Sequence, residues 1–129
     1  MIHHIEIYVS NLEKSIAFWG WLLDELGYST YQSWEDGRSF KMDQTYLVFV
    51  QAEEKYLDVP YHRKRVGLNH LAFQATSTKH VDQLTEEIKR RKHPILYETQ
   101  HPYAGGPEHY AVYCEDPDRM KVEIVAPSK

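Results

Sequence analysis

Two histidines occur at matching positions in two copies of one short pattern. The first copy is HIEIYVS (residues 4–10) and the second is HLAFQAT (residues 70–76). Each copy has the period-2 alternation of a β-strand and runs into a segment with helical spacing. A single strand histidine is usually structural. Two at equivalent positions, together with the carboxylate of Glu123 near the end of the chain, supply the donor types of a metal site.

Strand alternation sorts the candidate ligands by face. His4 and Glu6 share one face of the first strand, and its apolar residues share the other. We expect His4, His70 and Glu123 to lie on one concave face, with their apolar neighbours packed beneath the helices. Two imidazoles and one carboxylate form a facial triad that leaves coordination positions open for water or substrate. We therefore predict one divalent metal ion, and zinc, iron, manganese, nickel and cobalt all suit these donors.

A structural interpretation of the same residues remains open. In it, the histidines belong to the core or the rim, and Glu123 is an exposed strand residue. The remaining histidines are expected on loops, helix surfaces or opposite faces, outside the site: His3, His62, His80, His93, His101 and His109.

Glu6 is the candidate catalytic base. It lies two residues from His4 on the same strand face, roughly 7 Å along the strand. A poorly solvated carboxylate at this position would accept a proton more readily. The alternative is that Glu6 is a rim residue that faces water.

The elements that position these residues repeat in the same order. We predict one α+β domain of two βαβββ modules, with curved mixed sheets around a metal-binding cup. The first module covers residues 1–52, a charged connector covers 53–65, and the second module covers 66–129. The predicted strands are 4–9, 28–34, 39–42, 46–51, 66–75, 95–98, 109–115 and 120–125. Helices follow Ser10 or Asn11 and Thr76 or Ser77, which are N-cap residue types, and residues 101–107 form an inserted loop.

Composition narrows the function classes. The chain has 129 residues, 42% of them hydrophobic, and a net charge of −4, which argues against nucleic acid as a partner. The basic runs at 62–65 and 89–92 are expected to be a solvated turn and a helix C-terminus. One cysteine, Cys114, indicates a reducing compartment and packs as a small hydrophobic residue. No signal peptide or membrane span is evident, so we expect a soluble, cytoplasmic protein.

The chain resembles the vicinal oxygen chelate superfamily, which contains glyoxalases, fosfomycin-resistance proteins and extradiol dioxygenases. The resemblance rests on residues 4–19, 22–28, 67–73 and 116–125. It implies paired βαβββ modules around a divalent metal, often in homodimers that exchange modules, with His4, His70 and Glu123 at the ligand positions. A fourth ligand would come from strand 46–51, which has no carboxylate before Gln51. This departure from glyoxalase I is similar to the three-ligand arrangement of dioxygenases and fosfomycin-modifying enzymes, although extradiol dioxygenases are generally longer chains.

The resemblance implies a small metal-dependent enzyme of the lyase or dioxygenase type. Its substrate would be a small molecule that chelates the metal through vicinal oxygens, in an isomerisation, an epoxide opening or an oxygenation. Two alternatives remain. One is a metal-free protein that binds aromatic drugs, as bleomycin-resistance proteins do, and the aromatic content of 13% suits such a cleft. The other is a regulatory or immunity protein with a vestigial site.

Overall fold

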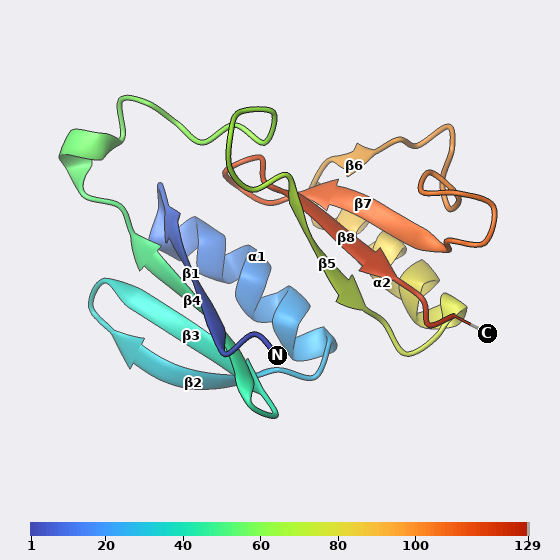
Figure 1. The fold of residues 1–129 in the computed structure, drawn as a ribbon, viewed down its shortest axis with the longest axis horizontal. Helices are drawn as coiled ribbons and strands as arrows, with labels where there is room; N and C mark the ends of the chain where they lie inside the picture. The colour runs from blue at the N-terminus through green and yellow to red at the C-terminus, as the bar shows by residue number, and fades with distance from the viewer. Residues whose placement is uncertain (129) are drawn as a thin grey trace. The chain divides into compact units, whose positions relative to one another are not determined.

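The structure is a computed structural model that describes residues 1–128. The chain divides into two compact units, Met1–Tyr61 and His62–Lys129. The division falls inside the segment 53–65. Each unit contains one four-stranded mixed sheet and one α-helix (Figure 1), which confirms the predicted α+β class with two βαβββ modules. Among the described residues, we find no helix with the length and apolar character that crossing a membrane requires.

In the first unit, β1 (His4–Val9) leads into α1 (Leu12–Glu25). Three strands follow: β2 (Ser29–Trp34), β3 (Gly37–Met42) and β4 (Thr45–Gln51), and then a short 3-10 turn, η1 (Glu54–Tyr56). The strand order is β1-β4-β3-β2, with β1 parallel to β4 and the other pairs antiparallel. The alternation predicted for β1 is present, because Ile7 and Val9 are buried while His4 and Glu6 are exposed.

Helix α1 packs on this sheet through its apolar face. The Trp19 ring is fully buried and stacks on Phe49 of β4, with 5.0 Å between the ring centroids. The Asn11 side chain caps the helix by accepting a hydrogen bond from the backbone N–H of Lys14 at 3.1 Å. After the helix, Gly27 has φ +98°, a conformation that glycine adopts without steric cost.

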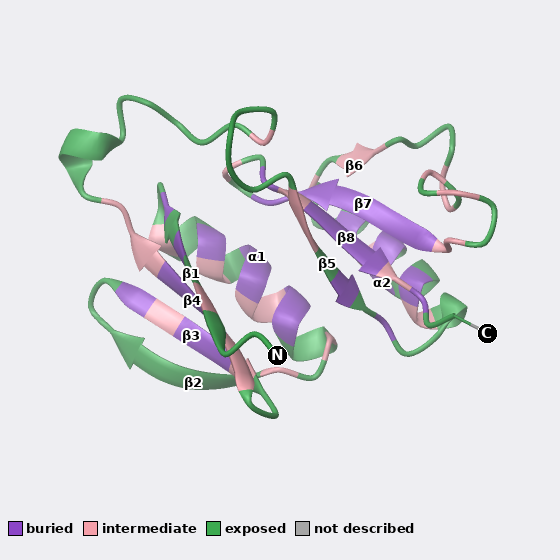
Figure 2. Cartoon of the chain, in the orientation of Figure 1, coloured by how far each residue is buried: buried purple, intermediate pink, exposed green. Residues whose placement is uncertain are grey.

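In the second unit, β5 (His70–Gln74) leads into α2 (Thr78–Arg90), followed by β6 (Ile95–Leu96), β7 (Ala111–Glu115) and β8 (Lys121–Val125). The strand order, β5-β8-β7-β6, repeats that of the first unit, with β5 parallel to β8. Strands β7 and β8 are the most buried part of the fold (Figure 2). Cys114 is fully buried among the apolar residues of this core, as predicted for a small hydrophobic side chain.

The predicted element ends were less accurate than the elements. Residues 66–69 do not form a strand, because the parallel pairing with β8 begins at His70, and Gly67 has φ +133°. Strand β6 stops before Tyr97, whose φ of +58° leaves the extended region. Residues 109 and 110 precede β7 rather than open it. The helix caps were predicted as one of two residues in each repeat, and the second of each pair, Asn11 and Ser77, is the cap.

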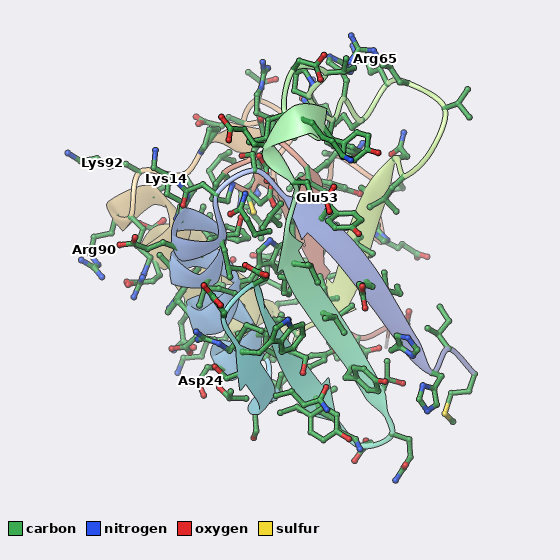
Figure 3. The ribbon with its side chains drawn as sticks, turned by 90° about the vertical axis from the view of Figure 1, so that its left-hand side faces the viewer. Lys14, Asp24, Glu53, Arg65, Arg90 and Lys92 are labelled. Carbon is green, nitrogen blue, oxygen red and sulfur yellow. The ribbon has the colours of Figure 1, made fainter. Side chains whose placement is uncertain are left out.

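The basic run at the end of α2 is paired within its own helix. Lys89 Nζ lies 3.7 Å from Glu86, and both Arg90 and Arg91 contact Glu87. Hydrogen bonds from these two arginines lower the pKa of the half-buried Glu87 carboxyl to about 2. Arg90 projects away from the ribbon at this end of the helix (Figure 3), where positive charge suits the negative pole of the helix dipole.

Candidate metal centre

The carboxylate of Glu123 is the centre of the polar cluster in the second unit. Glu123 lies in the middle of β8 and is 4% exposed. Its neighbours Val122 and Ile124 point into the apolar core and are fully buried, so alternation puts Glu123 on the opposite face of the sheet. Such a buried carboxylate requires partners that compensate for its lost hydration.

His70 supplies the first partner. The parallel register pairs His70 with Lys121 and Ala72 with Glu123, so His70 lies diagonally across from Glu123 on the adjacent strand. Its Nε2 atom is 3.1 Å from Glu123 Oε1. The two predicted ligands of the second unit are thus in direct contact, as their strand positions suggested.

Asn69 determines the tautomer of a neutral His70, that is, which ring nitrogen carries the proton. The Asn69 Oδ1 atom lies 2.7 Å from His70 Nδ1, and an amide oxygen only accepts, so Nδ1 donates. A neutral His70 then presents the lone pair of Nε2 to Glu123 Oε1. Two acceptors at this distance repel each other unless a cation, either a proton or a metal ion, lies between them. Metal-bound histidines are commonly oriented by such a second hydrogen bond.

The spacing of these two donors suits a divalent metal. Donor atoms that each lie about 2.1 Å from a metal, and at right angles about it, are about 3 Å apart. The distance between His70 Nε2 and Glu123 Oε1 is 3.1 Å. The pair therefore fits two adjacent positions of one coordination sphere.

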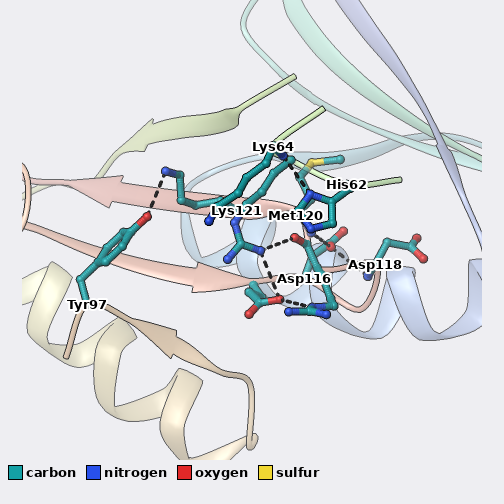
Figure 4. A network of polar contacts seen from close by, with 10 residues as sticks. His62, Lys64, Tyr97, Asp116, Asp118, Met120 and Lys121 are labelled. Carbon is teal, nitrogen blue, oxygen red and sulfur yellow. Dashed lines mark hydrogen bonds and ion pairs between the residues drawn. The ribbon is translucent and has the colours of Figure 1, made fainter. Parts of the chain in front are cut away.

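Tyr113 contacts the carboxylate of Glu123 from the neighbouring strand, β7. It lies directly opposite Glu123 in the antiparallel pairing of β7 and β8. Burial raises the pKa of Tyr113 to about 12, and the charge of Glu123 and a hydrogen bond to it add to the effect. The phenol is therefore neutral near pH 7, and its O–H group donates a hydrogen bond to Glu123. On the same face, Lys121 Nζ donates to Tyr97 Oη at 3.3 Å (Figure 4) and lies 5.9 Å from the centroid of the Tyr113 ring.

His109 is the residue of this cluster that we did not predict. We expected it outside the site, yet its Nε2 atom contacts Glu123 Oε2, the oxygen that His70 leaves free. Strand alternation does not reach His109, because β7 begins at Ala111 and the position of His109 depends on the loop before that strand. His70 and His109 contact different oxygens of Glu123, so each histidine faces the carboxylate from its own side. The donor atoms of His70, His109 and Glu123 do not surround a common point. Within residues 1–128, no three His, Cys, Asp or Glu side chains form a group arranged for a metal.

His4, the predicted ligand of the first unit, is exposed on β1. Its ring stacks on Tyr46 with 4.7 Å between centroids, and its Nδ1 atom lies 2.8 Å from Nδ1 of His3. The contact with His3 uses Nδ1 of His4 and not Nε2, which suits a ligand that binds through Nε2. The ligand role of His4 stays a prediction. Glu6 is exposed too, so the structure does not give it the poorly solvated surroundings that we required of a base.

The repeat shows why the first unit lacks a carboxylate of its own. The register of β1 and β4 pairs Glu6 with Val48, as that of β5 and β8 pairs Ala72 with Glu123. Val48 therefore occupies the position of Glu123. At the end of β4, the Gln51 side chain accepts from the backbone N–H of Leu12 at 2.8 Å and donates to the carbonyl of Ser10 at 2.9 Å. Gln51 is thus engaged in fixing the start of α1.

A turn on the β7–β8 side keeps these strands in register. Asp116 is buried, and its Oδ1 atom accepts hydrogen bonds from the backbone N–H groups of Asp118 at 2.9 Å and Met120 at 2.8 Å (Figure 4). Arg63 of the connector lies 3.5 Å from Glu115, and it donates to the carbonyl of Arg119 at 3.0 Å. The turn thus fixes where β8 begins, two residues before Glu123.

Comparison with known proteins establishes the family. Residues 1–124 match the family model of the Glyoxalase/Bleomycin resistance protein/Dioxygenase superfamily, and the chain belongs to this superfamily. It is 61% identical over 127 residues to the uncharacterized protein YqjT of Bacillus subtilis (strain 168), covering 98% of this chain and 99% of that protein.

Solved structures support the same fold. The crystal structure of a proposed glyoxalase from Bacillus halodurans is 64% identical, with a TM-score of 0.97, covering 98% of this chain and 96% of that one. The fosfomycin resistance protein FosX of Listeria monocytogenes is 23% identical, with a TM-score of 0.68, covering 97% and 89% of the two chains. At that identity, the likeness to FosX shows the fold alone.

Proposed function

We propose that this protein is a small enzyme that depends on one divalent metal ion and acts on a small substrate with two neighbouring oxygens. The observation that carries the proposal is the pair formed by His70 Nε2 and Glu123 Oε1, 3.1 Å apart, with Asn69 fixing the histidine. A pure binding protein has no need for two donors at ligand spacing. His4 would supply the third ligand.

The residues around the pair would control the charge and hydration of the site. The metal, when bound, would act as a Lewis acid that stabilises negative charge on the two substrate oxygens. Burial of Glu123 and Tyr113 excludes water from one side of the carboxylate. Tyr113 keeps its proton and holds Glu123 by a hydrogen bond. Lys121 adds a positive charge on the same sheet face, which favours substrates that carry or develop negative charge.

Three reaction types share this requirement: isomerisation or lyase chemistry, epoxide opening and oxygenation of a vicinal diol. Glu6, two residues from His4 on the same strand face, stays the proposed base for a proton transfer, although it is exposed to water as in the rim alternative. The panel that separates the reaction types contains a 2-hydroxycarbonyl compound, an epoxide beside an oxyanion and a catechol supplied with oxygen. Turnover of one class, lost in Glu123→Gln, would assign the reaction.

Metal content tests the proposal directly. Elemental analysis of the untagged protein, after incubation with zinc, iron, manganese, nickel or cobalt and removal of the free ions, should give near one metal per chain. His70→Ala and Glu123→Gln should lose it, and His4→Ala should lose it if the first unit supplies a ligand. His80→Ala is the matched control, because His80 lies on α2 and contacts Thr76.

Absence of metal from the wild-type protein under all five conditions would contradict the proposal. Ligand-induced stabilisation by flat aromatic compounds, without turnover, would then support the binding-protein alternative.

We also propose a homodimer, which light scattering coupled to size-exclusion chromatography would test.

A further inference from the structure

The inserted loop of the second unit brings His109 to the carboxylate. In the first unit, β2 and β3 are joined by a short turn, whereas residues 97–110 separate β6 from β7. The loop is held at several points. The backbone N–H of Ala111 donates to the carbonyl of Pro102 at 3.0 Å, and that of His109 donates to the carbonyl of Gly106 at 3.2 Å. The Tyr110 hydroxyl donates to Asp82 of α2 at 2.5 Å.

Gly105 allows the loop to pack directly on the site. A Cβ atom at this position would lie 2.5 Å from Cδ2 of His109 and 2.7 Å from the hydroxyl oxygen of Tyr113. No side chain fits there unless both groups, or the loop itself, move. The loop backbone therefore limits the movement of the two side chains that contact Glu123 from the β7 side.

His109 and His70 divide the two oxygens of Glu123 between them. Oε1 faces Nε2 of His70, and Oε2 contacts Nε2 of His109. A carboxylate with one oxygen engaged by an N–H group has only the other oxygen available, so it binds a metal through a single atom. Hydrogen-bonded carboxylate ligands are oriented in this way in metal sites.

We propose that His109 is a positioning residue that holds Oε2 of Glu123, so that Oε1 alone is presented beside His70 for the metal. The loop 97–110 serves to keep His109 in this position. The inference rests on the proposed function, since it assigns a role around the same metal. It also accounts for the insertion, which the repeat of the two modules does not explain.

The test is the affinity for cobalt(II) and zinc(II), measured by competition with a chromophoric chelator. His109→Ala should weaken binding about 10- to 100-fold, the effect typical of residues that orient a ligand. His109→Gln keeps an N–H donor on a side chain of related length, and it should recover most of the affinity. His80→Ala should bind as the wild type does. The cobalt(II) absorption spectrum should change in His109→Ala and return in His109→Gln, because the carboxylate changes its mode of binding.

The outcomes separate the two proposals. If the wild-type protein binds neither metal, the proposed function is overturned and this inference with it. If the wild type binds and His109→Ala has the same affinity and spectrum, the positioning role alone is overturned. A loss far beyond 100-fold in both His109 variants would make His109 a ligand, which also overturns a positioning role. Because His109→Ala could unfold, circular dichroism is recorded for each variant, and the His109→Gln result decides if the alanine variant is not folded.

Discussion

Gly105 and Gly106 are adjacent glycines that the structure requires for different reasons. A Cβ atom at Gly105 would lie 2.5 Å from His109 and 2.7 Å from Tyr113, whereas a Cβ atom at Gly106 would meet nothing within 4 Å. Gly106 has φ +135°, which is strained for any residue with a side chain. We therefore expect Gly105→Ala to disturb the site and Gly106→Ala to disturb only the loop backbone.

The magnitudes follow from these distances. Carbon contacts are comfortable at about 3.5 Å, so Gly105→Ala must displace both His109 and Tyr113, or the loop itself, by about 1 Å. Overpacking of this kind costs about 1–3 kcal/mol, reduced by about 0.5 kcal/mol because alanine restricts the unfolded chain. The backbone strain in Gly106→Ala costs a similar amount, about 1–3 kcal/mol. The free energies of unfolding thus fall similarly in both variants, and the site separates them.

Two assays on the same samples make the comparison. Urea unfolding followed by far-ultraviolet circular dichroism gives the stability of the metal-free protein, and chelator competition gives the zinc affinity. Gly105→Ala should lose about tenfold in zinc affinity, because His109 can no longer hold Glu123. Gly106→Ala should keep the wild-type affinity. Equal zinc affinities in the two variants, at equal loss of stability, would refute the reasoning about the contact between the loop and His109.

Two further predictions concern side chains near the site. Asp116→Ala should lower the free energy of unfolding by about 3 kcal/mol in urea denaturation, because it leaves two backbone N–H groups of the β7–β8 turn without an acceptor. Asp116→Asn keeps an acceptor oxygen and should lose less than half as much. Equal losses in the two variants would show that the charge of Asp116 matters more than its hydrogen bonds in the turn. The hydrogen bond to Asp82 raises the pKa of Tyr110 from 10.0 to about 12, so its contribution to stability is complete below pH 10 and disappears as the pH rises through 12. Phenolate absorbance should show Tyr110 ionising closer to pH 10 in Asp82→Asn, with Tyr110→Phe identifying its signal, and an unchanged titration would contradict the assignment.

Much of the fold follows from local patterns in the sequence. The alternation of residues 4–9 predicted β1 and its buried face, and polar cap residues marked the start of both helices. Strand ends were less predictable because they depend on pairing partners distant in sequence. Residues 66–69 were predicted as the start of a strand, but the parallel pairing with β8 begins only at His70.

The candidate site, like the fold, was predictable only in part. Alternation and repeat were enough to expect His70 and Glu123 on one sheet face, and the parallel register brings them into contact. The contact between His109 and Glu123 depends on the course of the loop 97–110. That course is set by the packing of Gly105 against His109 of the loop and Tyr113 of β7, which no local pattern encodes.

Cys114 in the second unit and the tryptophans in the first give each unit a reporter of its own. Burial raises the pKa of this thiol to about 12, so the folded protein should resist alkylation and peroxide, and reagents should reach it only when the β7–β8 core opens. The three tryptophans of the chain, Trp19, Trp21 and Trp34, all lie in the first unit. Indole fluorescence therefore follows the melting of one half, thiol labelling follows the other, and their coincidence or separation shows whether the duplicated modules unfold as one cooperative body.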